Sequence, residues 1–307
     1  MHLLIPHAAA LDPACLHTLA DLGWRHLPEV LKRLAPTERL GADEFDPIAP
    51  HEHALAAAWG WREGALPFAA RSAKADGVDV GERAWALLTP VHWHVGREQV
   101  TLADPASLAL DEAESRQLFD AARPLFESEG FTCAFGAASR WYVANDTFAD
   151  LRCASLDRVV ARNVDRWMPE GTQARLLRRL QNEVQMLLYT HPVNDAREAR
   201  GALPVNSFWL SGCGRWQASD ESDVRVDERL RAPLFAQDWA AYADAWRAID
   251  TGAVAELLAG LKRGEPARLT LCGERHAQRF EPTDAPWWKR IAQSWQGVEP
   301  HAVLEAL

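Results

Sequence analysis

Cysteine and positive charge are both scarce in this sequence. Its 307 residues include five cysteines, an odd number, and none of them forms a Cys-x-x-Cys pair. Such spacing argues against a disulfide framework or a zinc knuckle and favours reduced thiols. The 33 Lys and Arg residues face 43 Asp and Glu residues, which leaves a net charge of −10. We therefore expect neither nucleic acid nor an anionic membrane as a partner.

Long apolar runs are missing as well. No segment approaches the roughly 18 consecutive apolar residues that a membrane helix needs. The apolar start at 3–5 is not accompanied by any Lys or Arg before Arg25, so the basic region of a secretory signal peptide is absent. These absences predict a cytoplasmic protein.

Tryptophan, by contrast, is abundant, with 14 residues. Its large apolar ring and single N–H suit it to cores and to interfaces. Most of these residues are expected in the core. The pairs Trp59–Trp61 and Trp287–Trp288 raise an alternative, a tryptophan-rich module for protein–protein interaction.

Patterns typical of strands and helices alternate along the chain. Apolar runs predict strands, at 3–5, 84–91, 131–135, 140–143, 207–210 and 268–272. Periodic apolar residues and capping signals predict helices, at 12–22, 27–34, 51–61, 172–189, 238–249 and 253–262, with a further one that begins at 111. The stretches 37–50 and 71–83 are predicted to be loops. This alternation predicts an α/β fold with a mixed or largely parallel sheet flanked by helices.

Shifts in composition predict where the chain divides. They lie near 104–109 and in the charged stretch 220–231. Residues 1–105 and 220–307 are therefore predicted to form one α/β core unit, and residues 106–219 an inserted α+β segment. Within that segment Pro124 falls inside the helix that begins at 111, and we expect a kink or a break there.

Two histidines at the end of an apolar strand are the first candidate site. In Val91-His92-Trp93-His94-Val95, alternation along a strand places His92 and His94 on one face, about 7 Å apart. Two imidazoles at this spacing chelate a transition metal when a third ligand joins them. The alternative is that both rings form hydrogen bonds to neighbours on a polar sheet face.

A glycine-rich stretch after a strand is the second candidate. In Ser211-Gly212-Cys213-Gly214-Arg215, the glycines let backbone N–H groups approach an anion, and Arg215 adds positive charge. Backbone amides and Arg215 would also lower the pKa of Cys213 and make its thiol a nucleophile. The alternative is a tight turn that binds nothing.

The third candidate is a polar run that follows the predicted helix 172–189. His191, Asn194, Arg197 and Arg200 lie at a boundary between helix and loop. This combination of side chains suits an oxyanion or phosphate clamp. A capped, solvated turn is the alternative.

The same stretches carry a resemblance to a known family. The helix 174–188, the segment His191-Pro192-Val193-Asn194 with Arg197, and the stretch 203–214 resemble archaeal-type cofactor-independent phosphoglycerate mutases of the alkaline phosphatase superfamily. Those enzymes have a similar helix before a His-Pro-x-Asn-x-x-Arg segment and an Asn-x-x-Trp-Leu-x-Gly-x-Gly strand and turn, whose first residue matches Asn206. The whole chain, including 88–96, resembles bacterial regulatory proteins of the RpfE type.

This resemblance implies a reduced alkaline-phosphatase-like fold whose inserted segment corresponds to the mutase substrate-binding domain. It also implies a shell for a phosphate or another anion, formed by His191, Asn194, Arg197, Asn206, Gly212, Gly214 and Arg215.

The catalytic centre of the mutases finds no match here. They use a phosphorylated serine and two divalent metals held by Asp and His, with the first Asp in an Asp-Gly at the end of the first strand. In this sequence that strand ends in Pro6-His7-Ala8, and the first serine is Ser72. Near the last strand, Glu274 and His276 stand where the mutases have an Asp-His pair.

Three functions compete on these grounds. The first is a pseudoenzyme: a cytoplasmic regulatory or ligand-binding protein without a cofactor, which binds a phosphorylated small molecule or a protein partner. The second is a metal-dependent phosphoester enzyme with a relocated site, where His92, His94 and His276 hold one zinc or manganese ion. The third is the tryptophan-rich interaction module.

Overall fold

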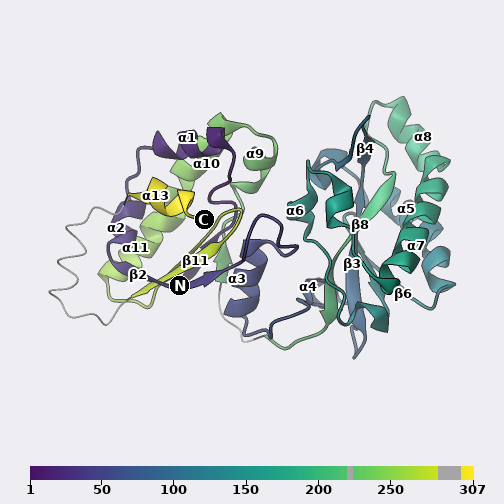
Figure 1. Cartoon of the computed structure of the whole chain (residues 1–307), viewed down its shortest axis with the longest axis horizontal. Helices are drawn as coiled ribbons and strands as arrows, with labels where there is room; N and C mark the ends of the chain where they lie inside the picture. Colours follow the sequence, from purple (N-terminus) through teal and green to yellow (C-terminus); the bar gives the residue numbers. More distant parts are fainter. Residues whose placement is uncertain (220–223, 283–298) are drawn as a thin grey trace. The chain divides into compact units, whose positions relative to one another are not determined.

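The chain folds into two compact units in the computed structural model, which describes residues 1–219, 224–282 and 299–307. Unit 1 comprises residues 1–60 and 219–307, and unit 2 comprises residues 61–218. Unit 1 therefore contains both ends of the chain (Figure 1). In the described residues, no helix is long and apolar enough to cross a membrane.

Unit 1 is built on a mixed five-stranded sheet with the order β2-β11-β10-β1-β9. Its strands are β1 (His2–Ile5), β2 (Leu34–Leu40), β9 (Val224–Val226), β10 (Arg268–Cys272) and β11 (Ala277–Pro282). Its helices are α1 (Pro13–Ala20), α2 (Leu27–Leu31), α3 (Pro50–Ala58), α9 (Arg231–Phe235), α10 (Trp239–Ile249), the π-helical segment η4 (Asp250–Val254), α11 (Ala255–Lys262) and α13 (Pro300–Glu305). β1 pairs in parallel with β9 and β10, whereas β11 runs antiparallel to β10 and β2.

Helices pack on both faces of β1, which explains its unbroken apolar run. Leu3 and Ile5 belong to the larger core of unit 1, to which α1, α10 and α11 contribute. Leu4 points to the other face, where it clusters with Ala54 of α3. Central parallel strands are typically apolar at every position for this reason.

Two aspartates fix helix ends in unit 1. Asp12 caps α1, because its side chain accepts the N–H of Ala14 at 2.8 Å. Asp250 is buried in η4, and its carboxylate accepts the N–H groups of Arg25 and Leu27, each at 2.7 Å, at the start of α2. The π-helical turn thus carries a side chain that satisfies the amino end of a neighbouring helix.

Unit 2 contains an antiparallel sheet with the order β6-β7-β3-β8 and a separate pair, β4-β5. Its strands are β3 (Ala84–Val91), β4 (Trp93–Val95), β5 (Val100–Leu102), β6 (Thr132–Ala137), β7 (Arg140–Ala144) and β8 (Ser207–Arg215). Its helices are α4 (Phe68–Ala75), η1 (Pro105–Leu108), α5 (Glu112–Glu127), η2 (Asp146–Phe148), α6 (Leu156–Val159), η3 (Val164–Trp167), α7 (Thr172–Tyr189) and α8 (Pro192–Ala199). On α7 the predicted apolar stripe is buried, with Leu180, Val184 and Leu188 in the core.

The α/β class is confirmed, with a mixed sheet flanked by helices. The division of the chain differs from the predicted one, since unit 1 ends at residue 60 rather than at 105. The physical reason is the pairing of β3, which lies between β7 and β8 of unit 2. Because both partners are distant in sequence, composition near residue 105 carries no trace of this pairing.

Three local predictions are wrong. β2 begins at Leu34 and extends to Leu40, into the predicted loop 37–50, because β11 pairs with it. α4 occupies part of the predicted loop 71–83, where its alanines are buried against Trp85 and Tyr142. α5 continues through Pro124 to Glu127, so the predicted break is absent, although Pro124 lacks the N–H for one helical hydrogen bond.

The tryptophans of the described residues serve mainly as core. Trp141, Trp209 and Trp246 are among the largest fully buried side chains. Trp61 is buried in unit 2, where its ring packs edge-on against Phe68 at 5.1 Å between centroids. The pair Trp287–Trp288 lies outside the described residues.

Candidate functional site

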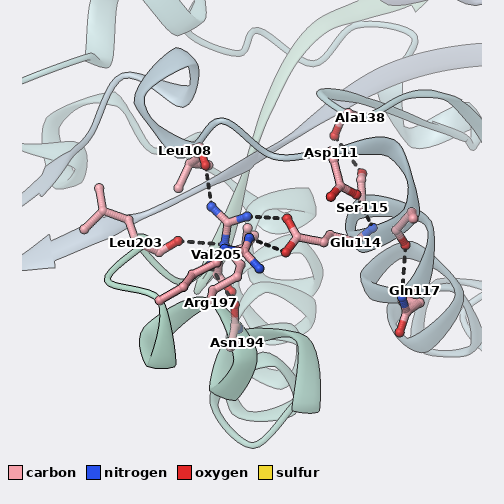
Figure 2. Close-up of polar contacts among 12 residues, drawn as sticks. Leu108, Asp111, Glu114, Ser115, Gln117, Ala138, Asn194, Arg197, Leu203 and Val205 are labelled. Carbon is pink, nitrogen blue, oxygen red and sulfur yellow. Dashed lines mark hydrogen bonds and ion pairs between the residues drawn. The ribbon is translucent and has the colours of Figure 1, made fainter.

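Three predicted site residues, His92, Asn194 and Arg197, form hydrogen bonds to the segment 203–206, which leads into β8. Figure 2 shows Asn194 and Arg197 beside Leu203 and Val205. Arg197 on α8 has no exposed surface. Its Nε donates to the carbonyl of Leu203 at 2.8 Å, and another of its nitrogens donates to the carbonyl of Leu108. A buried guanidinium therefore ties the segment to η1.

Asn194, one turn earlier on α8, holds the next part of this segment. Its side-chain amide donates to the carbonyls of Leu188 and Val205, both at 2.8 Å. Its Oδ1 accepts the N–H of Val205 at 2.9 Å. The side chain is buried and its amide is hydrogen-bonded through both its oxygen and its nitrogen.

Asn206 and His92 secure the end of the segment. Asn206 accepts the N–H of Trp93 at 2.7 Å and donates to the carbonyl of Trp93 at 3.0 Å, like a neighbouring strand. His92 Nδ1 lies 2.8 Å from the carbonyl of Pro204. A donor is required there, so the proton sits on Nδ1 and Nε2 is left as the acceptor.

Glu114 completes this arrangement and is a residue that the sequence reasoning missed. It lies in the first turn of α5, where Asp111 caps the helix by accepting its N–H at 2.8 Å. Its carboxylate, 12% exposed, pairs with Arg197 at 2.5 Å and with the half-exposed Arg200 (Figure 2). A buried arginine needs a carboxylate partner, but the sequence does not show that Arg197 is buried, so it gave no signal for Glu114.

These contacts assign a framework role to Asn194, Arg197 and Asn206 in this structure. The anion-binding role implied by the resemblance stays a prediction. Asn194 and Arg197 are buried, so an anion would reach them only if the surrounding structure opened. His191 caps α8, with Nδ1 accepting the N–H of Val193 at 3.2 Å, and its ring is partly exposed.

The glycine-rich stretch is part of a strand, so the predicted turn is wrong. β8 runs on through Gly212 and Gly214 to Arg215, and a register shift opposite β3 marks a β-bulge. Gly212 has φ +64°, and a Cβ there would lie 2.8 Å from the backbone nitrogen of Ala69 on α4. The glycines thus allow the bulge and the close approach of a helix.

Arg215 and Cys213 differ in exposure at this end of β8. Arg215 is half exposed, and it pairs with Asp146 at 2.8 Å and donates to the carbonyl of Glu82 at 2.5 Å. Cys213 is buried, and its burial raises the pKa of its thiol well above the usual range. The prediction of a lowered pKa for Cys213 is therefore wrong, because burial, and then the neighbouring Cys153, disfavours the thiolate.

His92 and His94 do face each other, with ring centroids 4.5 Å apart and nearly perpendicular planes. Burial, and then the neighbouring His94, lowers the pKa of His92. Across the described part of the chain, no third His, Cys, Asp or Glu side chain completes a three-ligand group with them. His276, the predicted third ligand, belongs to unit 1, where it follows β10 and its N–H donates to the carbonyl of Leu307 at 2.7 Å.

A second polar region lies at the carboxyl ends of the parallel strands of unit 1. His7 follows β1 in a left-handed conformation, with φ +56°. Its ring lies 5.1 Å from that of His51 and 5.4 Å from that of Phe235, and its carbonyl accepts the hydroxyl of Tyr242 at 2.8 Å. A strained histidine at the end of a central strand marks this edge as a candidate site.

The neighbouring strand β9 ends in an open depression with a volume of about 700 Å³. Its walls are charged side chains from the end of β9 and small residues of η4, together with Glu256: Arg225, Val226, Asp227, Glu228, Arg229, Gly252, Ala253 and Glu256. Ligands of open α/β sheets bind outside the carboxyl ends of the strands. The depression has that position.

Two arginines at the rim of this depression are each paired with a carboxylate. Arg229 binds Asp227 through Nε and Nη2, at 2.8 and 2.5 Å, and these bonds lower the pKa of Asp227. Arg225 pairs with Glu256. Both arginine side chains are nearly half exposed. Each uses only part of its five N–H donors on its partner.

Comparisons with known proteins add little. No protein-family model matches the chain, and no curated protein does. Among solved structures, the chain is similar to a cofactor-independent phosphoglycerate mutase from Thermoplasma acidophilum DSM 1728, with 14% identity, a TM-score of 0.37, and coverage of 93% of this chain and 90% of that one. It is also similar to PH0037 from Pyrococcus horikoshii, with 12% identity, a TM-score of 0.43, and coverage of 92% and 87%. At these scores the likeness does not establish a common fold, so the alkaline-phosphatase-like arrangement stays a prediction.

Proposed function

We propose that the chain is a regulatory, ligand-binding protein that takes a phosphorylated small molecule at the carboxyl edge of β9 and β1 in unit 1. It senses that molecule and does not transfer its phosphate. The RpfE-type resemblance supports the regulatory role. The depression beside β9 supports the binding role.

The observation that carries this proposal is the placement of Arg229. Asp227 holds two of its nitrogens, so the guanidinium is oriented before any ligand arrives. Arg–phosphate pairs are among the strongest charge-assisted hydrogen bonds, and orientation in advance reduces the entropy lost on binding. Arg225 supplies a second guanidinium on the same rim, and Gly252 leaves room beside them.

The residues at this edge do not fit a two-metal phosphotransfer centre held by Asp and His. Such a centre needs free carboxylates and a nucleophile beside them. The strand β1 is followed by Pro6-His7-Ala8, and among the described residues of unit 1 the only serine is Ser219. Of the nearby carboxylates, Asp227 is bound to Arg229, and Glu274 accepts the N–H of Leu11 at 2.9 Å.

Calorimetric titration with 3-phosphoglycerate and with inorganic phosphate tests the binding role. We expect Arg229→Gln and Arg225→Gln each to weaken binding roughly 10- to 100-fold, the effect of losing one charge-assisted hydrogen bond. Arg215→Gln is the matched control, because Arg215 is equally exposed but lies in unit 2. Equal affinity in all variants would refute the site.

A phosphotransfer assay tests the second half of the proposal. With manganese or zinc present, we expect no turnover of phosphoglycerate or of a generic phosphoester. Turnover that a chelator abolishes would contradict the proposal.

A second candidate function is a single divalent metal site at His92 and His94. It is favoured by the facing rings and by the bond from His92 to Pro204, which leaves Nε2 of His92 as the acceptor. Elemental mass spectrometry of protein purified without chelator would find one equivalent of zinc or manganese, lost in His92→Ala/His94→Ala. Equal metal content in both proteins would end this candidate.

A further inference from the structure

Two cysteines of unit 2 that are 60 positions apart touch in the core. The sulfurs of Cys153 and Cys213 lie 3.2 Å apart, and both residues are free thiols. Each side chain is 4% exposed and belongs to the main core cluster of the unit. Neither residue contributes to the proposed ligand site in unit 1.

The β-bulge in β8 aims Cys213 at its partner. Trp85 pairs with Gly214 and Leu87 with Ser211, so a single residue of β3 faces both Gly212 and Cys213. Gly212 takes the left-handed conformation that begins a G1 bulge. Bulges redirect the side chain that follows them.

Cys153 lies in an irregular segment. Residues 151–155 form neither helix nor strand between η2 and α6. The indole N–H of Trp209, on β8, donates to the carbonyl of Ala154 at 2.9 Å and holds this segment against the strand. The segment lacks the ladder of hydrogen bonds that fixes a strand, so it is the side that opens more easily.

We propose that Cys153 and Cys213 form a reversible disulfide, made by exchange with a low-molecular-weight disulfide such as oxidised glutathione. The thiolate of Cys153 attacks one sulfur of the small disulfide, forms a mixed disulfide and releases one small thiol. The thiolate of Cys213 then attacks the sulfur of Cys153 and releases the second small thiol. The protein loses two electrons and two protons, and the small disulfide is reduced to two thiols.

Burial makes this exchange slow and selective. Burial raises the pKa of Cys213, so its thiol stays protonated until the segment 151–155 opens to water. Once formed, the bond closes a loop of 60 residues and removes freedom from the unfolded chain. We expect the melting temperature of unit 2 to rise by on the order of 10 °C in the oxidised protein.

Thiol counting and peptide mapping of the full-length protein test this proposal. Protein equilibrated with oxidised glutathione is denatured in the presence of an alkylating agent and then digested. We expect one linked pair of peptides containing Cys153 and Cys213, two fewer thiols than the reduced protein, and full recovery with dithiothreitol. A linked pair that involves other cysteines, or five free thiols after prolonged equilibration, would overturn the proposal.

Matched variants sharpen the result. Cys153→Ser and Cys213→Ser should each abolish the linked peptide and the rise in melting temperature. Cys133→Ser, in the same unit and half-buried, should leave both unchanged. If Cys213→Ser fails to fold, Cys153→Ser and the wild-type peptide map still decide the matter. A melting temperature that rises equally in Cys153→Ser would refute the role of this bond.

Discussion

One arginine of unit 2 and two arginines of unit 1 are used in different ways. In unit 2, Arg197 is fully buried and its donors go to Glu114 and to two backbone carbonyls. In unit 1, Arg225 and Arg229 are nearly half exposed and share a depression. A guanidinium whose donors are used inside the protein stabilises the fold, whereas one that keeps donors at a surface is available to a ligand.

A polar sequence motif does not by itself identify a ligand site. The stretch from His191 to Arg197 has the composition of an anion clamp, yet its Asn and Arg hold the backbone between α8 and β8. The end of β9 carried no signal as strong. In the sequence, a short strand followed by alternating charges looks like any solvated loop. It can be interpreted as a ligand site only when β1 is known to lie beside β9.

Removing Arg197 is the change with the largest expected effect. Arg197→Leu leaves Glu114 buried with only the half-exposed Arg200 as a charged partner, and we expect unit 2 to lose about 3 to 5 kcal/mol of stability. Hydrogen exchange of the amides of α5 and α8 measures this. Arg215→Leu is the exposed control and should cost less than about 1 kcal/mol. Equal losses would erase the contrast between buried and exposed arginines.

The next largest expected effect is the dependence of the stability of unit 1 on pH, which comes from the buried His2. Burial, and then Arg279 and Arg268, lowers the pKa of His2 from 6.5 to about 4. Unfolding therefore takes up a proton between these two values. Above about pH 6.5 the stability of unit 1 does not depend on His2, and it falls by up to about 3 kcal/mol as the pH drops from 6.5 to 4.

Hydrogen exchange of the β1 and β10 amides at pH 7 and pH 5 measures this slope. The variant His2→Gln keeps a polar group near Thr270, the hydrogen-bond partner of His2 at 2.8 Å, but cannot titrate. We expect a flatter pH dependence in the variant. The same slope in both proteins would contradict the assignment to His2.

At the bulge in β8, replacing a glycine should lower stability by a smaller amount that depends on the position. Gly212→Ala combines a left-handed φ with a Cβ 2.8 Å from Ala69, and we expect it to lose about 2 kcal/mol or more. Gly130→Ala shares a left-handed φ of +80° but meets nothing within 4 Å, and we expect about 1 kcal/mol. Urea unfolding compares the two. Equal costs would show that α4 does not pack tightly on β8.

The weakest expected effect concerns the rim of the depression. Arg225 and Glu256 are both substantially exposed, so Glu256→Gln should change the stability of unit 1 by less than about 1 kcal/mol. Thermal unfolding would show this. A larger loss would mean that Arg225 is held as part of the framework, like Arg197, and would weaken the contrast between the units.

Local signals predicted much of the fold, while pairing between distant segments escaped them. The helix Thr172–Tyr189 and the cap at Asp12 follow from periodicity and side-chain chemistry over a few residues. The strand β2 and the unit boundary at residue 60 depend on partners far along the chain. No short window of sequence contains that information.

In the candidate sites, too, local features were predictable from the sequence and contacts between distant segments were not. The placement of His92 and His94 on one side was predicted from their spacing, but their ring centroids lie 4.5 Å apart, closer than the roughly 7 Å expected on a strand. The partner of Arg197 was not predicted, because Glu114 lies 83 positions away, in the first turn of the helix predicted to begin at 111. The rim of Arg225 and Arg229 becomes visible only once β9 is seen to lie beside β1.

Mapping where a phosphorylated molecule protects the backbone tests the central claim most directly. Hydrogen exchange of the wild-type protein would be measured with and without saturating 3-phosphoglycerate. We expect slower exchange at residues 225–229 and 252–256 of unit 1, and no change at 191–197 and 212–215. Protection confined to 191–215 of unit 2 would contradict it, because the motif residues would then bind the ligand.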